Sequence, residues 1–257
     1  MQVPESPDAT VALTAAGVTV VVEACEGRLP AIVHWGPELP RLDAGLAQAL
    51  IRAAQPVAGS NNLEPVPRLP VLPEHQAGWT GRPGLRGSFA GRGWSPAFTC
   101  RELTLDGAPA PAFVSSGPGI IEAVAVAGDQ LELRLTIELL PSGLLRARAA
   151  VTNTGGDVYQ LDDLVLAFPV PAEASELLDF AGRHNGERAP QRSRLGTGTH
   201  LRENRKGRTG ADSAYVLHAG IPGFGFAAGE VWGVHTAWSG NHTHYAERVF
   251  TGEQVLG

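Results

Sequence analysis

The chain has only two cysteines, Cys25 and Cys100, among its 257 residues. They form neither a CxxC pair nor a metal-ligand spacing, so both are predicted to be buried small hydrophobic side chains rather than a nucleophile. Other nucleophile signatures are missing too, because the sequence contains no GxSxG or SxxK motif. Without these motifs the sequence indicates no catalytic residue, and we expect no metal and no cofactor.

Long hydrophobic runs are also missing. No apolar stretch approaches the ~18–20 residues that span a bilayer, and the longest, from Val18 to Val22, has the size of a strand. The first residues, MQVPESPDAT, have no basic segment followed by an apolar one, which a secretion signal requires. We therefore expect a soluble, cytoplasmic protein that binds no membrane.

Positive charge is scarce overall, since the formal net charge is −6, which gives no reason to expect nucleic acid as a partner. Residues 183–208 depart from this balance with seven arginines and one lysine against two glutamates. Three interpretations remain: a phosphate or nucleic-acid site, a solvated loop, or arginines paired with carboxylates across an interface. The run contains no aromatic residue, unlike most nucleic-acid readers, so we favour pairing and take as interface candidates Arg183, Arg188 and Arg205.

The 32 glycines and 20 prolines exclude long helical bundles. Apolar and polar residues alternate strictly from Leu131 to Leu139, which is typical of a strand with one buried face. Turn residues separate this segment from further strand candidates, so residues 119–171 are predicted to form an antiparallel meander. The chain is therefore predicted to be all-β, with one short helix over residues 44–54 that Asp43 caps.

A Gly- and Pro-rich stretch at about residues 55–95 has no strand pattern. Such a long irregular segment is usually functional or disordered, and its aromatics Trp79, Phe89 and Trp94 favour an ordered, functional loop. We predict a single domain over residues 1–257, because no linker separates two independently patterned halves.

Two weaker motifs lie near the C-terminus. Residues 223–228 fit a loose dinucleotide fingerprint, but they lie within a strand pattern at Gly223–Ala227 with no helix after it. His235, His242 and His244, with Glu247 close by, match no established metal spacing, and histidines beside a turn usually face solvent. We expect neither motif to bind a cofactor or metal.

Three segments, in order along the chain, resemble the α-galactosidases of family 36 among the glycoside hydrolases. Residues 32–36 (IVHWG) resemble that family's HWG motif, residues 180–194 (FAGRHNGERAPQRSR) its GRW.RER and SRRG stretches, and residues 235–241 (HTAWSGN) its YSGN strand. The resemblance implies an antiparallel β-supersandwich of the galactose mutarotase-like kind. It also implies a (β/α)8 barrel downstream that carries both catalytic aspartates. The chain is similar to the N-terminal domain alone, so no catalytic residue is assigned here.

The resemblance implies that the parent enzyme hydrolyses terminal α-linked galactose with retention and forms a homo-oligomer. The domain would brace the barrel, mediate oligomer contacts and lend a loop to the sugar pocket. In many members a loop of the type YGxGDxRxPA brings an Asp to galactose, whereas the comparable residues 78–85 here (GWTGRPGL) contain none. The sugar-binding candidates are therefore Trp79 as an apolar wall and Arg82 as a hydroxyl donor, with Glu74 and His75 beside them.

The sequence leaves alternatives open for the role of Trp79 and for the function of the whole chain. Trp79 equally fits a plug at the end of the sandwich, in which case it would be buried rather than exposed. The whole chain also fits a free-standing mutarotase-like sugar epimerase with His and Glu as acid and base, or a non-catalytic carbohydrate-binding or structural module.

Overall fold

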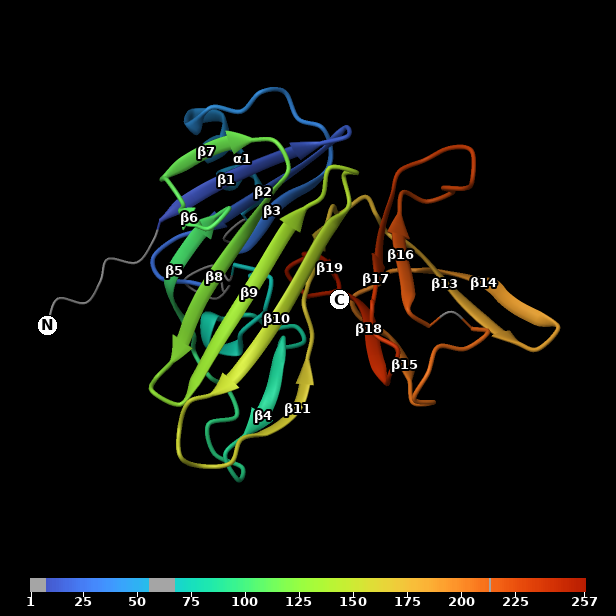
Figure 1. The fold of residues 1–257 in the computed structure, drawn as a ribbon. Coiled ribbons are helices and arrows are strands. Elements are labelled where there is room, and N and C mark those ends of the chain that lie inside the picture. Colours follow the sequence, from blue (N-terminus) through green and yellow to red (C-terminus); the bar gives the residue numbers. More distant parts are fainter. Residues whose placement is uncertain (1–7, 56–67, 213) are drawn as a thin grey trace, which may run out of the picture. The chain divides into compact units, whose positions relative to one another are not determined.

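The computed structural model describes residues 8–55, 68–212 and 214–257 (Figure 1). The described residues divide into two compact units, those within Met1–Trp79 and Pro83–Leu166 and those within Thr80–Arg82 and Ala167–Gly257. The sequence predicts one domain. Whether the two units unfold as one cooperative domain stays a prediction.

The first unit contains two sheets and a separate strand pair. One sheet has the order β3-β2-β1-β7, with bounds β1 Ala9–Ala15, β2 Val18–Ala24, β3 Ala31–Pro37 and β7 Phe113–Ser116. The other has the order β10-β9-β8-β5-β6, with bounds β5 Thr99–Leu105, β6 Ala108–Pro109, β8 Gly119–Ala127, β9 Leu131–Leu139 and β10 Leu145–Asn153. The strand pair joins β4 (Leu85–Ser88) to β11 (Gln160–Leu164). The predicted antiparallel pairing is correct throughout the described strands except between β1 and β7, which run parallel.

Strand β9 shows why this unit forms. Its alternate residues Leu131, Leu133, Leu135, Ile137 and Leu139 are all at most 2% exposed. They lie on one face, as the period of two requires, and the intervening polar residues lie on the other. The predicted meander is confirmed here, because β8, β9 and β10 pair in antiparallel order.

The predicted helix is also present, as α1 (Ala44–Ala54). The Asp43 carboxylate accepts the Leu46 backbone N–H at 2.8 Å, which satisfies one of the unpaired donors of the first turn. Ala47 and Ile51 are buried, whereas Leu46 is half exposed. No helix among the described residues is long and apolar enough to cross a membrane.

The second unit contains two further sheets (Figure 1). One has the order β12-β19-β18-β15, with bounds β12 Phe168–Val170, β15 Gly198–Asn204, β18 His242–Arg248 and β19 Gln254–Leu256. The other has the order β14-β13-β16-β17, with bounds β13 Glu176–Arg183, β14 Gly186–Arg194, β16 Val216–Gly220 and β17 Val231–His235.

Two local predictions are corrected, and one alternative is excluded. Gly223–Ala227 is not a strand but part of a turn, in which Gly223 has φ +87°. The solvated loop, one of the three interpretations of the basic residues 183–208, is excluded, because most of these residues form β14 and β15. Of the predicted loop at 55–95, residues 56–67 lie outside the described residues, and the rest includes the 3-10 turn η1 (His75–Ala77) and strand β4.

Candidate functional site

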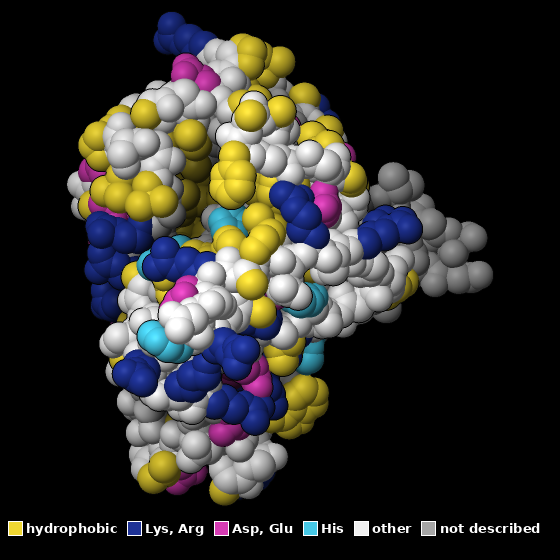
Figure 2. Space-filling model, turned by 90° about the vertical axis from the view of Figure 1, so that its right-hand side faces the viewer, with side chains coloured by type: hydrophobic (Ala, Val, Ile, Leu, Met, Phe, Trp, Pro, Cys, Tyr) yellow, Lys and Arg dark blue, Asp and Glu magenta, His cyan; other side chains and the backbone are white. Residues whose placement is uncertain are grey.

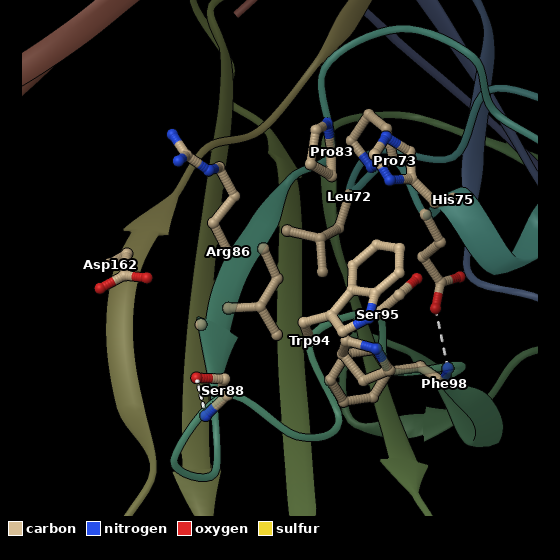
Figure 3. A pocket seen from close by; sticks show the side chains of 15 residues that line it. Leu72, Pro73, His75, Pro83, Arg86, Ser88, Trp94, Ser95, Phe98 and Asp162 are labelled. Atoms are coloured by element: carbon tan, nitrogen blue, oxygen red, sulfur yellow. Dashed lines mark hydrogen bonds between the residues drawn. The ribbon is translucent and has the colours of Figure 1, made fainter.

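A cavity of about 410 Å³ opens in the first unit beside η1 and β4 (Figure 3). Glu74 and His75 line it from one side, Arg86 and Asp162 contribute from β4 and β11, and Trp94 contributes its indole. The Trp94 side chain is 65% exposed. An exposed indole beside polar groups is an arrangement that suits a sugar ring, because pyranose C–H faces stack on aromatic rings while hydroxyls need polar partners.

Trp94 lies on residues 89–98, hereafter the Trp94 loop. The loop begins with a tight turn in which Phe89 and Arg92 exchange two backbone hydrogen bonds of 2.9 and 3.1 Å. Ala90 and Gly91 at the centre of this turn have positive φ values of 51° and 82°, the conformation that glycine favours in two-residue turns. Residues 93–98, which follow the turn, belong to no strand, so Trp94 projects from irregular backbone.

Glu74 is a buried carboxyl group in the cavity wall. Its side chain is 8% exposed, and its Oε1 accepts the Phe98 backbone N–H at 2.7 Å, drawn as a dashed line in Figure 3. Burial raises the pKa of Glu74 from 4.5 to about 7, although the Phe98 N–H opposes that shift by favouring the charged form. Near pH 7 this carboxyl group therefore exists in both protonation states.

His75 follows Glu74 and is exposed at the mouth of the cavity. Its imidazole ring meets the Trp94 indole edge to face, with ring centroids 6.4 Å apart and planes at 70°. Both rings also border a second hollow next to the first. The structure thus brings together two of the predicted sugar-binding residues, Glu74 and His75, with Trp94.

Trp79 and Arg82 occupy other positions and are absent from the described lining of this cavity. Trp79 is only 3% exposed, which is the burial expected of a structural plug rather than of an indole open to a ligand. Residues Thr80–Arg82 count with the second unit. Direct contact of Trp79 or Arg82 with a sugar stays a prediction.

In the second unit the segment around Arg82 is held by a buried carboxylate. Glu247 is 7% exposed. Its two oxygens accept the Arg82 backbone N–H at 2.7 Å and the Thr199 hydroxyl at 2.6 Å. The Arg82 guanidinium lies over the Tyr245 ring, 5.4 Å from its centroid. These contacts fix the backbone at Arg82 within the second unit.

Lys and Arg side chains gather on the face shown in Figure 2, with Asp and Glu among them. Several basic residues of 183–208 pair inside the chain. Arg192 lies 3.1 Å from Glu176, and His200 lies 2.8 Å from the buried Asp179. Of the interface candidates, Arg205 pairs with Glu203, whereas Arg183 and Arg188 are exposed and make no ion pair with a described residue.

The C-terminal histidines form hydrogen bonds to the backbone. His244 was expected to face solvent but is 2% exposed, and burial lowers its pKa. Its Nδ1 lies 2.9 Å from the Gly257 carbonyl oxygen, and its Nε2 lies 3.0 Å from the Tyr215 carbonyl oxygen and 2.7 Å from the Thr236 hydroxyl. Among the described residues no group of three or more His, Cys, Asp and Glu side chains is placed to hold a metal ion.

A family model described as the glycosyl hydrolase family 36 N-terminal domain matches residues 28–257. The chain belongs to this family. An α-galactosidase from Escherichia coli is 34% identical over 227 residues, which are 88% of this chain and 30% of the E. coli protein.

Solved structures give the same fold. An α-galactosidase from Geobacillus stearothermophilus in complex with raffinose matches this chain with a TM-score of 0.78 and 21% identity. The match covers 95% of this chain and 36% of the Geobacillus chain. An α-galactosidase from Lactobacillus brevis matches all of this chain, 100%, with a TM-score of 0.79 and 16% identity, again over 36% of its own length. The predicted all-β fold is confirmed, and the chain spans about a third of these relatives.

Trp94 was not among the site residues predicted from sequence. Glycine flanks both Trp79 and Trp94, at Gly78 and Gly93, so local sequence gives the two indoles the same signal. The difference between them is burial, which depends on contacts made by distant parts of the family 36 domain.

Proposed function

We propose that this chain is the N-terminal part of a retaining α-galactosidase that hydrolyses terminal α-linked galactose. The observation that carries the proposal is the 34% identity to an α-galactosidase over 88% of the chain, together with the family match over residues 28–257. In a retaining mechanism one carboxylate forms a glycosyl-enzyme and a second acts as acid and then as base. We place both carboxylates in a catalytic barrel outside these 257 residues, so the chain alone is inactive.

The domain's own part in the reaction is to contribute a wall to the sugar pocket. We assign this role to the Trp94 loop, because Trp94 is 65% exposed beside a cavity that also has Glu74 and His75 in its lining. The indole would stack on a pyranose face and the polar groups would bind its hydroxyls. The exposed Arg183 and Arg188 would contact carboxylates of a neighbouring subunit in a homo-oligomer.

An activity assay on two proteins tests this proposal. The full-length protein should release the aglycone from an aryl α-galactoside, and NMR of the first product should show α-galactose. The 257-residue chain should release none at the same concentration. Turnover by the isolated chain would contradict the proposal, and so would interconversion of galactose anomers by that chain in a polarimeter, which would instead support an epimerase.

A further inference from the structure

Glu74 holds one end of the Trp94 loop. Its carboxyl Oε1 accepts the Phe98 backbone N–H at 2.7 Å, and the Phe98 side chain is itself buried. The Glu74 backbone carbonyl also accepts N–H groups from Ala77 at 3.1 Å and Trp79 at 3.3 Å. One residue thus connects η1 to the C-terminal end of the Trp94 loop, so the position of that end depends on its carboxyl group.

Other contacts hold the beginning of the loop. The Phe89 ring packs edge to face on Tyr159, with ring centroids 4.8 Å apart. The Gly91 backbone N–H donates to the Ser88 hydroxyl at 3.0 Å. Among these described contacts at the two ends of the loop, the Glu74 carboxyl is the group that titrates near neutral pH, because burial raises the pKa of Tyr159 further above 10.

Among the described residues, few charged or titratable groups lie around Glu74. His75 is its exposed neighbour in the chain, and Arg86 of β4 and Asp162 of β11 line the same cavity as exposed side chains. The remaining lining near Glu74 is largely apolar, with Leu72, Pro73 and Pro96. Burial, rather than a neighbouring charge, therefore dominates the electrostatics of this carboxyl group.

We propose that Glu74 is a positioning residue: its carboxyl group holds Phe98 and thereby sets the position of Trp94 at the cavity, and loss of its proton loosens the loop. This deepens the proposed function and rests on it only for the nature of the ligand that Trp94 meets.

The physical reason is the different hydration of the two forms. A protonated carboxyl group can stay in the apolar wall while it accepts the Phe98 N–H. A carboxylate in the same place requires water, and the adjacent cavity of about 410 Å³ has room for it. As the pH rises through 7, Glu74 gains this hydration by turning toward the cavity, so its hold on Phe98 weakens and the Trp94 loop gains freedom.

Tryptophan fluorescence of this chain tests the proposal without any sugar or enzyme assay. The chain has five tryptophans, so the signal of Trp94 is the difference between the chain and its Trp94→Phe variant. Acrylamide quenching of that difference signal should increase between pH 5 and pH 9 with a midpoint near 7. In Glu74→Gln, which keeps an oxygen for the Phe98 N–H but cannot ionise, quenching should stay constant at the low-pH level.

Two further variants separate Glu74 from its neighbours. His75→Gln should retain the transition, because His75 does not contribute the acceptor for Phe98. Glu74→Asp draws the acceptor back by one methylene, so quenching of Trp94 should be high at every pH. A wild-type chain without a transition would overturn the proposal, as would a transition that persists in Glu74→Gln or disappears in His75→Gln.

In the full-length protein the same variant should separate binding from chemistry. KM for an aryl α-galactoside should rise several-fold from pH 6 to pH 8 in the wild type, and by less in Glu74→Gln, after correction for the pH dependence of kcat. Because the fluorescence test needs no catalysis, failure of the proposed activity would leave its result intact. An unchanged KM profile in Glu74→Gln, in an active enzyme, would contradict the positioning role.

Discussion

Replacing Trp79 by alanine tests whether this side chain is part of the packed interior. The side chain is 3% exposed, so the substitution removes an entire buried indole and leaves a cavity behind. Substitutions of buried aromatic residues by alanine usually cost about 3–5 kcal/mol. Each kcal/mol lowers the melting temperature by roughly 2–4 °C in a protein of about this size. We therefore expect Trp79→Ala to lower the melting temperature by roughly 6–20 °C.

The matched control is Trp94→Ala, which removes the same side chain from a site where it is 65% exposed. Surface substitutions usually change stability by only about 0.5 kcal/mol, so the control should melt within a few degrees of wild type. Far-UV circular dichroism is the suitable measurement, because it does not depend on tryptophan fluorescence. If Trp79→Ala melts like wild type and instead raises KM in the full-length protein, Trp79 belongs to the sugar site and the structural assignment is wrong.

Three further predictions concern stability and reactivity. The pKa of Glu74 rises from 4.5 to about 7 on folding, so the folded state binds the Glu74 proton more tightly than the unfolded state does. This tighter binding stabilises the folded state fully below pH 4.5, and the stabilisation is lost as the pH rises through 7. Chemical unfolding should therefore show that the free energy of unfolding of Glu74→Gln rises by about 3 kcal/mol relative to that of the wild type between pH 4.5 and pH 8. A difference in unfolding free energy that does not change with pH would refute this. The Cys100 thiol is 1% exposed and burial raises its pKa to about 11, so a thiol reagent at pH 8 should modify the less buried Cys25 first, and equal rates would be contrary evidence. Calorimetry should show one cooperative transition, and two separated transitions would mean that the two units are independent domains.

Much of the sheet structure was readable from local pattern. From Leu131 to Leu139 every second residue is apolar, and β9 has the same bounds, because burial of one strand face imposes a period of two on the sequence. The helix over Ala44–Ala54 was readable for a similar reason, since its cap, Asp43, is adjacent in sequence. Both elements are recognisable because the residues that bury or cap them are neighbours in the sequence.

Other elements have no signature in their local sequence. All residues of β14 are exposed, so no hydrophobic period marks the strand, and backbone pairing with β13 creates it. At Gly223–Ala227 alternating Gly and Phe imitate a strand, although Phe226 is fully exposed in a turn. Backbone hydrogen bonding overrides side-chain pattern in both cases.

The candidate site was only partly predictable. Glu74 and His75 were chosen as ionisable neighbours of Trp79, and the structure does place them in the cavity lining. The partner that gives Glu74 its role is Phe98, which is 24 residues away in sequence. The exposure of Trp94 likewise results from the turn at Phe89–Arg92 and from the contacts at the two ends of its loop. Contacts across such separations do not appear in a single sequence.

The kinetic effect of Trp94→Ala in the full-length protein tests the central claim most directly. Its control is Trp238→Ala, because Trp238 is 63% exposed and lies in the second unit. Loss of a stacked sugar contact worth about 1–1.5 kcal/mol corresponds to roughly a tenfold fall in kcat/KM. We predict that Trp94→Ala lowers kcat/KM for an aryl α-galactoside by about tenfold while Trp238→Ala leaves it unchanged. Equal activity of the two variants would contradict the account, as would a full-length protein that does not hydrolyse α-galactosides.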